Sequence, residues 1–431
     1  MRIERLTIKN FKSIASAEVN FSPLTMIVGA NASGKSNIIN VFRFISNIAT
    51  DGIDNAIALQ GGIPYLANAS LPKGTPIEIH FVLDLENEGW IKSSNAKTVA
   101  LEIQNIKYCF VIQPNLRGGG YHIASDNLSL DFSCLQINQA EKKDQRYTDL
   151  NTRATFSFER KARKSTVSYN CIFDSEKKID EKTRSQIKND MTAQVFAKIC
   201  SENKKELMLY RFGMLLPPVF SENTFIRIFD FDPKELKKAS SMGAMKILDE
   251  NGSNLASVLQ NILRSRENRK KLTNLLVEFL PFIDNISIES NLDKSFSYKV
   301  KENYTSRSFH ANFLSDGTVS LIAIIIALYF EDLSDIVILE EPERNIHPKL
   351  LSSLLSSAED VSSEKQIIIT THNPELLKHA KLENIKLIRR DSNGFTSISE
   401  PSTSETVKCF IQNDLGLDDL FLQGLLGGGR I

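Results

Sequence analysis

The feature that most constrains the fold is a glycine-rich segment between an apolar strand and a helix. Residues 29–36 read GANASGKS, which matches the pattern G-x-x-x-x-G-K-[ST]. The run LTMIV before it predicts a strand, and from Ser36 onward apolar residues recur with helical spacing until about Asp51. In such a loop the backbone N–H groups face phosphate oxygens. We therefore expect the chain to fold around a phosphate site, rather than to have an ordinary glycine turn here.

The residue types in this loop suit a magnesium–triphosphate ligand, and the predicted cofactors are ATP and Mg²⁺. Lys35 would neutralise charge on the β- and γ-phosphates. Ser36 would give an oxygen to Mg²⁺, which takes few protein ligands and keeps several waters. The expected nucleotide contacts in the loop are Gly29, Asn31, Ser33, Gly34, Lys35 and Ser36.

A second chemical signal is a buried strand that ends in acids. Residues 336–343 read IVILEEPE, and ligands bind at the carboxyl ends of strands in α/β sheets. Adjacent strand residues point to opposite sides, so the two acids are expected to have separate tasks. Glu340 would hold Mg²⁺ through water, and Glu341 would orient or deprotonate the attacking water. The alternative is a solvated acidic loop.

Two further polar positions complete the candidate site. His372 follows the apolar run QIIITT and could reach a γ-phosphate, although a lone histidine is more often structural. Ser315 is a candidate N-cap for a helix that runs to about Asp332, and a helix N-terminus attracts anions. Because the loop at 29–36 already binds phosphate in cis, this second position would serve a nucleotide held by another subunit. The alternative is an ordinary capped helix.

The remaining pattern predicts an α/β fold with a mixed sheet and flanking helices. The continuous apolar runs at 336–339 and 366–370 are typical of parallel strands covered on both faces. A helical pattern extends from Leu255 to Leu280. Alternating runs predict further strands, which short turns would join into an antiparallel N-terminal sheet, at 3–10, 16–21, 77–83, 100–103 and 107–112.

Charge and composition limit the partners. The 52 basic residues balance 52 acidic ones, so any polyanion must be bound locally. The longest apolar run, 321–330, is far too short for a membrane span, and the charged N-terminus does not suit a signal peptide. Five separated cysteines fit reduced thiols, so we expect a cytoplasmic protein without membrane contact. The densest basic cluster supplies the candidate DNA contacts, although a solvated charged face is equally common: Arg160, Lys161, Arg163 and Lys164.

Together the four motifs, in this order, resemble the ATP-binding-cassette type of ATPase head found in the RecF, SMC and OLD families. The segment IKNFKS at 8–13 looks like the opening strand of those heads, where Lys12 would lie near the nucleotide. The segments EEPE, IHP, TTHNP and NGSNLA look most like standalone predicted ATPases related to OLD proteins. The resemblance covers residues 1 to about 390, with the middle of the chain unmatched. It implies a P-loop fold of the RecF and SMC type.

This resemblance divides the chain, which is too long for one hydrophobic core. Between Glu141 and Glu206 the apolar content falls, which predicts an exposed insert of α+β or helical structure. A glutamine loop has only Gln60 as a candidate, and a turn residue is favoured there. The expected divisions are an ATPase lobe at 1–135, a charged and helical inserted arm at 136–285, a second ATPase lobe at 286–400 and a tail at 401–431.

The resemblance also implies an activity and partners. In the family two heads sandwich two ATP molecules, so Ser315 and Gly317 would contact the γ-phosphate in trans within a homodimer or larger homo-oligomer. The expected reaction is hydrolysis of ATP to ADP and phosphate. Asp316 stands where transporter cassettes have glycine, which argues against a transporter subunit.

The wider role is expected from the same resemblance. OLD-type proteins continue into a nuclease domain, whereas this chain stops about 60 residues after His372. Similarity to two-gene phage-defence systems suggests a sensor and scaffold subunit with a separately encoded nuclease or toxin effector. The alternative is a DNA-repair or chromosome-maintenance ATPase of the RecF kind that binds DNA directly. A third interpretation is a nucleotide-binding scaffold with little turnover.

Overall fold

The chain folds into two compact units that each combine separate stretches of sequence. The computed structural model describes residues 1–85, 91–93, 99–138, 146–161, 167–174, 179–191, 206–215, 225–241, 247–331 and 334–427. The first unit consists of 1–21, 36–225 and 390–398, and the second of 22–35, 226–389 and 399–431. Lys35 and Ser36 are therefore neighbours in sequence that are assigned to different units.

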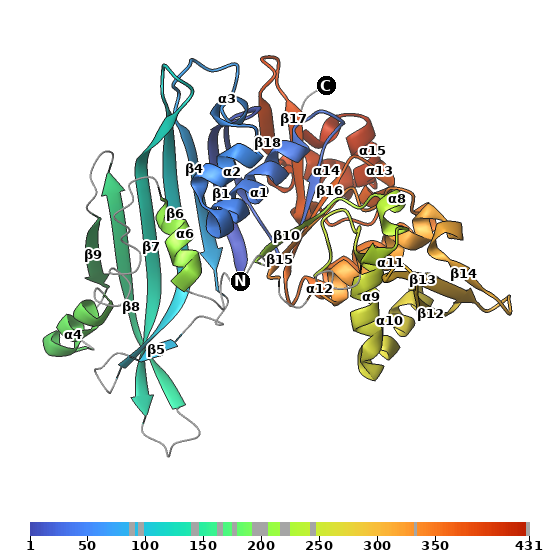
Figure 1. Cartoon of the computed structure of the whole chain (residues 1–431). Helices are drawn as coiled ribbons and strands as arrows, with labels where there is room; N and C mark the ends of the chain where they lie inside the picture. The colour runs from blue at the N-terminus through green and yellow to red at the C-terminus, as the bar shows by residue number, and fades with distance from the viewer. Residues whose placement is uncertain are drawn as a thin grey trace. The chain divides into compact units, whose positions relative to one another are not determined.

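The first unit is built on an antiparallel sheet (Figure 1). Its described strands are β1 (Arg2–Phe11), β2 (Ile14–Asn20), β4 (Ile77–Asp84), β5 (Ile91–Ser93), β6 (Val99–Pro114), β7 (Tyr121–Asn138), β8 (Arg146–Lys161) and β9 (Ser168–Phe173). They pair in the order β2-β1-β4-β6-β7-β8-β9, and β5 pairs with β6. The predicted antiparallel N-terminal sheet is confirmed, but the two runs at 100–103 and 107–112 form one strand, β6, with a register shift between Ile103 and Asn105.

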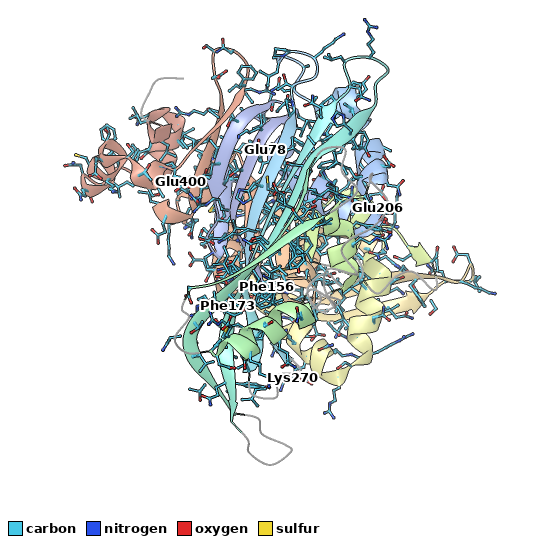
Figure 2. All side chains as sticks on the ribbon, turned by 90° about the vertical axis from the view of Figure 1, so that its left-hand side faces the viewer. Glu78, Phe156, Phe173, Glu206, Lys270 and Glu400 are labelled. Atoms are coloured by element: carbon cyan, nitrogen blue, oxygen red, sulfur yellow. The ribbon has the colours of Figure 1, made fainter. Side chains whose placement is uncertain are left out.

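The polar stretch that we expected to be an exposed insert contributes strands to this sheet. In β8 the residues Thr152, Ala154, Phe156 and Phe158 are buried in alternation with more exposed ones. Phe156, labelled in Figure 2, packs edge to face on Phe132 with ring centroids 5.5 Å apart. The expected boundary at 135/136 falls inside β7. The abundance of charged residues hid this period of two, which was the signal for a half-buried strand.

The described helices of the first unit are α1 (Lys35–Asp51), α2 (Ile53–Leu59), α3 (Ile63–Leu66), α4 (Glu181–Met191) and α6 (Met208–Leu215). Helix α1 buries Phe44 against Phe11, with ring centroids 5.8 Å apart. Gln60 is the C-cap of α2, which fits a turn residue. Strand β18 (Thr396–Ser399) begins in this unit, where the Thr396 N–H donates to the Ser13 carbonyl at 2.9 Å.

The second unit has a parallel sheet that carries the motifs. Its strands are β3 (Leu24–Val28), β10 (Ile226–Phe229), β15 (Ile336–Glu340), β16 (Gln366–Thr371) and β17 (Ile385–Arg390). They pair in the order β10-β15-β16-β3-β17, and every one of these pairs is parallel. Val28 aligns with Thr371, and Thr370 aligns with Glu340. The three motifs that follow β3, β15 and β16 therefore lie at one edge of the sheet. Parallel pairing in this sheet and antiparallel pairing in the other sheets agree with the predicted α/β fold of mixed strand direction.

A smaller antiparallel sheet and its helices complete the core of the second unit. Its strands are β11 (Ser240–Ser241), β12 (Ile283–Ser290), β13 (Ser295–Glu302) and β14 (Ser308–His310). The helical pattern from Leu255 to Leu280 forms two helices, α9 (Leu255–Arg264) and α10 (Arg266–Phe279), because Ser265 caps the second one. Helix α11 (Asp316–Tyr329) is buried at every residue from Thr318 to Leu328.

The remaining elements of this unit are α8 (Pro233–Leu236), η2 (Ala311–Phe313), η3 (Pro348–Leu350), α12 (Leu351–Val361), α13 (Pro374–Leu377), η4 (Leu382–Asn384), η5 (Pro401–Thr403), α14 (Glu405–Gln412), α15 (Leu417–Leu422) and η6 (Leu425–Gly427). The C-terminal residues join the same core, since Val407, Leu420 and Leu426 are buried in it. Among the described residues no helix is both long and apolar enough to cross a membrane.

Candidate functional site

The glycine-rich loop is fixed to the end of the parallel sheet. The Gly29 N–H donates to the carbonyl of Thr371 at 3.2 Å. A Cβ atom on Gly29 would lie 2.5 Å from the Ile388 carbonyl oxygen and 2.6 Å from Ser33 Oγ, so no larger residue fits without displacing the loop. Gly34 has φ +111°, a conformation that L side chains rarely adopt. The geometry thus requires both glycines of the motif, and the phosphate-binding role of the loop stays a prediction.

Lys35 lies inside this loop with its ammonium group held in place. The residue is 7% exposed. Its Nζ donates to the carbonyl oxygens of Gly29 at 2.8 Å and Ala30 at 3.1 Å, and it lies 3.6 Å from Glu341 Oε1. Burial lowers the pKa of Lys35, and the nearby Glu341 carboxylate offsets part of this effect. The loop and the acidic motif therefore meet at one ion pair within the second unit.

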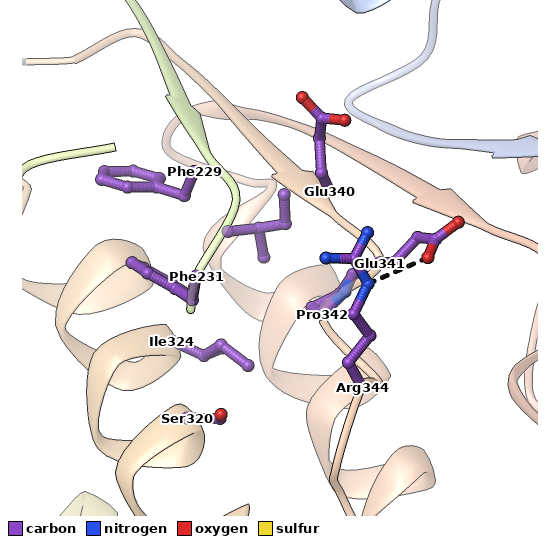
Figure 3. Close-up of a pocket in the computed structure, with 9 residues that line it drawn as sticks. Phe229, Phe231, Ser320, Ile324, Glu340, Glu341, Pro342 and Arg344 are labelled. Atoms are coloured by element: carbon purple, nitrogen blue, oxygen red, sulfur yellow. Dashed lines mark hydrogen bonds and ion pairs between the residues drawn. The ribbon is translucent and has the colours of Figure 1, made fainter. Parts of the chain in front are cut away.

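Glu341 stands at the centre of the site. It follows the last residue of β15 and has φ +44°, which is unusual for a residue with a side chain. Its N–H donates to the Thr370 carbonyl at 3.0 Å. Oε1 lies 2.9 Å from His372 Nδ1, and Oε2 accepts from Arg344 Nε at 3.0 Å (Figure 3). Burial raises the pKa of Glu341, but these hydrogen bonds outweigh burial and hold it below its ordinary value.

Glu340 and Glu341 have separate positions, although not for the reason that we predicted. Glu340 is the last residue of β15, whereas Glu341 already belongs to the following turn. In Figure 3 the two carboxylates point in different directions. Among the described residues no group of three or more His, Cys, Asp or Glu side chains forms a metal cluster. A Mg²⁺ site needs no such cluster, because the ion takes one or two protein oxygens, substrate phosphates and water.

Sequence reasoning missed a buried carboxylate behind Glu341. Glu343 is 5% exposed, and its Oε1 accepts a hydrogen bond from the Thr371 hydroxyl at 2.5 Å. Oε2 has no hydrogen-bond partner among the described residues. Burial raises the pKa of Glu343, and the Glu341 charge adds to the shift. The signal was present in the motif EPE, where a second acid follows a proline after the buried strand.

Arg344 is the other functional candidate that the sequence did not reveal. Its Nη1 donates to Asp230 Oδ1 at 2.8 Å while Nε contacts Glu341. Asp230 follows β10, more than a hundred positions before Arg344 in the chain. No local pattern could connect two residues so distant in sequence.

Ser315 caps α11 as predicted, since its Oγ accepts from the Thr318 N–H at 3.1 Å. Gly317 lies against the loop that follows Glu341, because a Cβ there would be 2.5 Å from the Asn345 carbonyl oxygen. Asp316 is paired with Lys237, whose Nζ lies 2.6 Å from Oδ1. The N-terminus of α11 therefore carries an acid, Asp316, whose negative charge is paired with the Lys237 ammonium group.

Two predicted nucleotide contacts lie in the first unit. Ser36 is the second residue of α1, and Lys12 follows β1, with its N–H donating to the Leu66 carbonyl at 2.8 Å. Burial lowers the pKa of Lys12, and the nearby Arg43 lowers it further. The roles of both residues at the nucleotide stay predictions. Asn31 is an exposed residue of the glycine-rich loop in the second unit.

The predicted DNA-binding cluster needs a correction at Arg160. This residue is 5% exposed, and its Nη2 lies 2.5 Å from Asp126 Oδ2 inside the antiparallel sheet. Asp126 also accepts from the hydroxyl of the buried Tyr108. Arg160 neutralises a buried acid, so it is not a surface cation for nucleic acid. Arg163, Lys164 and the side chain of Lys161 lie outside the described residues.

Comparisons with known proteins identify a family and several partial relatives. A family model described as AAA ATPase domain matches residues 1–377. The DNA replication and repair protein RecF of Halalkalibacterium halodurans is 31% identical over 87 residues, which are 19% of this chain and 24% of that relative. The RecF protein of Porphyromonas gingivalis is 49% identical over 47 residues, 11% of this chain and 13% of that relative. The matched segments thus span only about a quarter or less of these curated relatives.

A solved structure supports the fold along nearly the whole chain. A crystal structure of an Smc head bound to the C-winged helix domain of ScpA aligns with a TM-score of 0.51 at 14% identity. The alignment covers 93% of this chain and 98% of that chain. The fold is therefore that of a P-loop ATPase of the ATP-binding-cassette type. Because the family model spans most of the sequence, the chain belongs to the family described as AAA ATPase domain.

Proposed function

We propose that this chain is a Mg²⁺-dependent ATPase of which two copies close on ATP and separate after hydrolysis. The observation that carries the proposal is the contact between Lys35 and Glu341, 3.6 Å apart in the second unit. It joins the residue suited to hold a triphosphate to the residue suited to activate water. Binding energy from ATP would favour the closed pair of heads, because only that state places ligand groups on both sides of the nucleotide.

Each site residue has a part in the reaction. Lys35 and the loop N–H groups would bind the phosphates, and His372 would contact the terminal one. Ser36 and Glu340 would hold Mg²⁺, which supplies charge neutralisation to the β- and γ-phosphates. Glu341 would orient a water molecule and accept its proton as the oxygen bonds to the γ-phosphorus. The bond from phosphorus to the bridging oxygen breaks, which gives ADP and phosphate, and the proton on Glu341 is released to water.

The second half of the site would come from another copy. The N-terminus of α11 is capped by Ser315, and at Gly317 it packs closely against the backbone of Asn345. A helix N-terminus carries about half a positive charge, which suits a phosphate. The glycine-rich loop already provides the phosphate contacts of its own copy, so we assign the α11 end to the nucleotide of the partner.

We expect Ser315→Arg to keep the protein monomeric in ATP, because the added side chain would occupy the place of the partner's nucleotide. Light scattering with and without ATP and Mg²⁺ measures the change in mass. A matched control is Ser404→Arg, which removes a similar cap from α14. Loss of dimers in both variants, or ATP-dependent dimers in both, would count against the assignment of the α11 end.

The pair formed by Lys237 and Asp316 gives a further prediction. The carboxylate of Asp316 would repel a nearby phosphate if Lys237 did not neutralise it. We expect Lys237→Ala to slow ATP turnover, by about two- to tenfold for a pair whose acid is half exposed. The double variant with Asp316→Asn should recover most of the rate. A steady-state assay of both variants tests this, and a double variant slower than Lys237→Ala would contradict the charge argument.

We place the ATPase in a narrower role as the sensor and scaffold of an anti-phage defence system that acts through a separately encoded nuclease or toxin. This role is supported by the sequence resemblance of the EEPE and TTHNP motifs to standalone OLD-like ATPases. Purification of the chain with its natural neighbours tests the role directly. An ATP-dependent complex with a nuclease or toxin is the expected result.

The likeness to the RecF proteins favours a second candidate, an ATPase that binds DNA directly. The burial of Arg160 removes one residue that would have supported it. The two roles differ in their response to short duplex DNA. A RecF-like protein would bind it with strong salt dependence and hydrolyse ATP faster, whereas an effector scaffold would show neither effect.

A further inference from the structure

We propose that Arg344 is a positioning residue that fixes the orientation of the Glu341 carboxylate. Asp230 in turn holds Arg344 in place, so the three residues form an ion-pair relay. The inference rests on the proposed role of Glu341 in hydrolysis. It adds two residues to the site, one of which comes from a distant part of the sequence. Figure 3 shows Arg344 and Glu341 lining one pocket together with Phe231.

The guanidinium group of Arg344 uses two different nitrogens for its two partners. Nε donates to Glu341 Oε2 at 3.0 Å, and Nη1 donates to Asp230 Oδ1 at 2.8 Å. Because the guanidinium is planar and its donors have a fixed arrangement, fixing one contact also fixes the direction of the other. Asp230 can therefore control where Arg344 holds the carboxylate of Glu341.

Both ends of the relay are attached to rigid parts of the second unit. Asp230 directly follows β10, and its N–H donates to the Glu250 carbonyl at 3.0 Å. Strand β10 pairs in parallel with β15, where Phe229 aligns with Leu339. The Arg344 N–H donates to the Glu341 carbonyl at 3.1 Å, which closes a tight turn. The acid and the arginine thus start from adjacent strands of one sheet.

Glu341 has a reason to need such support. Its φ of +44° is a conformation of higher energy, which persists only where surrounding contacts determine it. His372 Nδ1 contacts Oε1, and Arg344 Nε donates a hydrogen bond to Oε2. Removal of Arg344 would leave the carboxylate held from one side, so that it could rotate away from the direction in which it meets water.

The exposure of the relay residues indicates that they contribute little to the free energy of unfolding. Arg344 and Asp230 have side chains 47% and 45% exposed, and ion pairs at that exposure usually contribute little to folding. Glu341, by contrast, is only 15% exposed. The effect of the relay should therefore appear in catalysis more than in the melting temperature.

We expect Arg344→Ala to lower kcat about ten- to a hundredfold with KM for ATP nearly unchanged, because misplacing a reacting group affects the chemical step. Arg344→Lys should not restore kcat, since one ammonium group cannot reproduce two fixed donors. Asp230→Asn should lower kcat in the same way while keeping the shape of the side chain. The double variant Arg344→Ala with Asp230→Asn should be no slower than Arg344→Ala alone.

The matched control is Lys408→Ala, which removes an exposed cation paired with the acid three residues before it, as Arg344 is paired with Glu341. Its kcat should equal that of the natural protein. An unchanged or increased kcat in Arg344→Ala, or additive losses in the double variant, would overturn the relay. If Glu341→Gln retains full turnover, the proposed function itself fails. If Glu341→Gln is inactive and Arg344→Ala is fully active, only the relay fails. Should Arg344→Ala fold poorly, Asp230→Asn alone decides.

Discussion

Replacing Glu341 with glutamine is expected to reduce kcat for ATP hydrolysis by about 10²- to 10⁴-fold, the usual contribution of a general base. The amide keeps the size of the side chain and can still accept from Arg344 or His372 at its oxygen. It cannot take a proton from the attacking water. The Lys35 ammonium and the loop N–H groups remain, so ATP binding should be retained. Steady-state turnover and equilibrium binding of ATP measure the two effects separately.

Glu375→Gln provides the control, because Glu375 is an exposed acid in the first turn of α13 that pairs with Lys378. This variant should turn over at the natural rate. Full turnover in Glu341→Gln would remove the assigned role of Glu341. Loss of ATP binding together with turnover would mean that Glu341 serves the structure of the loop rather than the chemical step.

Replacing Lys35 with alanine should weaken ATP binding by about ten- to a hundredfold, since a charge-assisted hydrogen bond contributes about 1.5–3 kcal/mol. Lys35 is 7% exposed, so a phosphate that it contacts would be largely removed from water. The loss of Lys35 also removes one cation beside Glu341, while the ion pair with Arg344 remains. Titration calorimetry with ATP and Mg²⁺ gives the change in Kd.

Lys386→Ala is a matched control, because Lys386 is another buried lysine of the second unit and pairs with Glu400 at 3.0 Å. Both variants lose a buried ion pair, and both are expected to melt at a lower temperature. Only Lys35→Ala should lose affinity for ATP. Equal affinities in the two variants would contradict the role of Lys35 in binding phosphate.

The fold could be predicted from sequence wherever one signal dominated. Strand β3 coincides with the predicted run Leu24–Val28, and β15 with the apolar run before the acids, because buried parallel strands are apolar on both faces. Strand β8 could not be recognised by composition, since polar residues such as Arg153 and Glu159 alternate with the buried ones. The break between α9 and α10 was missed because the prediction joined two apolar patterns across the polar run at 264–271, where the Ser265 side chain caps the second helix.

The candidate site likewise has residues that the sequence predicted and residues that it did not. Glu341, Lys35 and His372 meet because they follow neighbouring parallel strands, whose carboxyl ends lie at one edge of the sheet. Asp230 could not be found, because only the pairing of β10 with β15 brings it to Arg344. The burial of Arg160 was equally hidden, since its partner Asp126 lies on a neighbouring strand.

The most direct test is a structure of the Glu341→Gln variant with ATP and Mg²⁺. We predict a pair of copies in which Lys35 of one copy and Ser315 of the other contact the same γ-phosphate. A nucleotide enclosed by one copy alone, with Ser315 of every neighbouring copy far from it, would contradict the account.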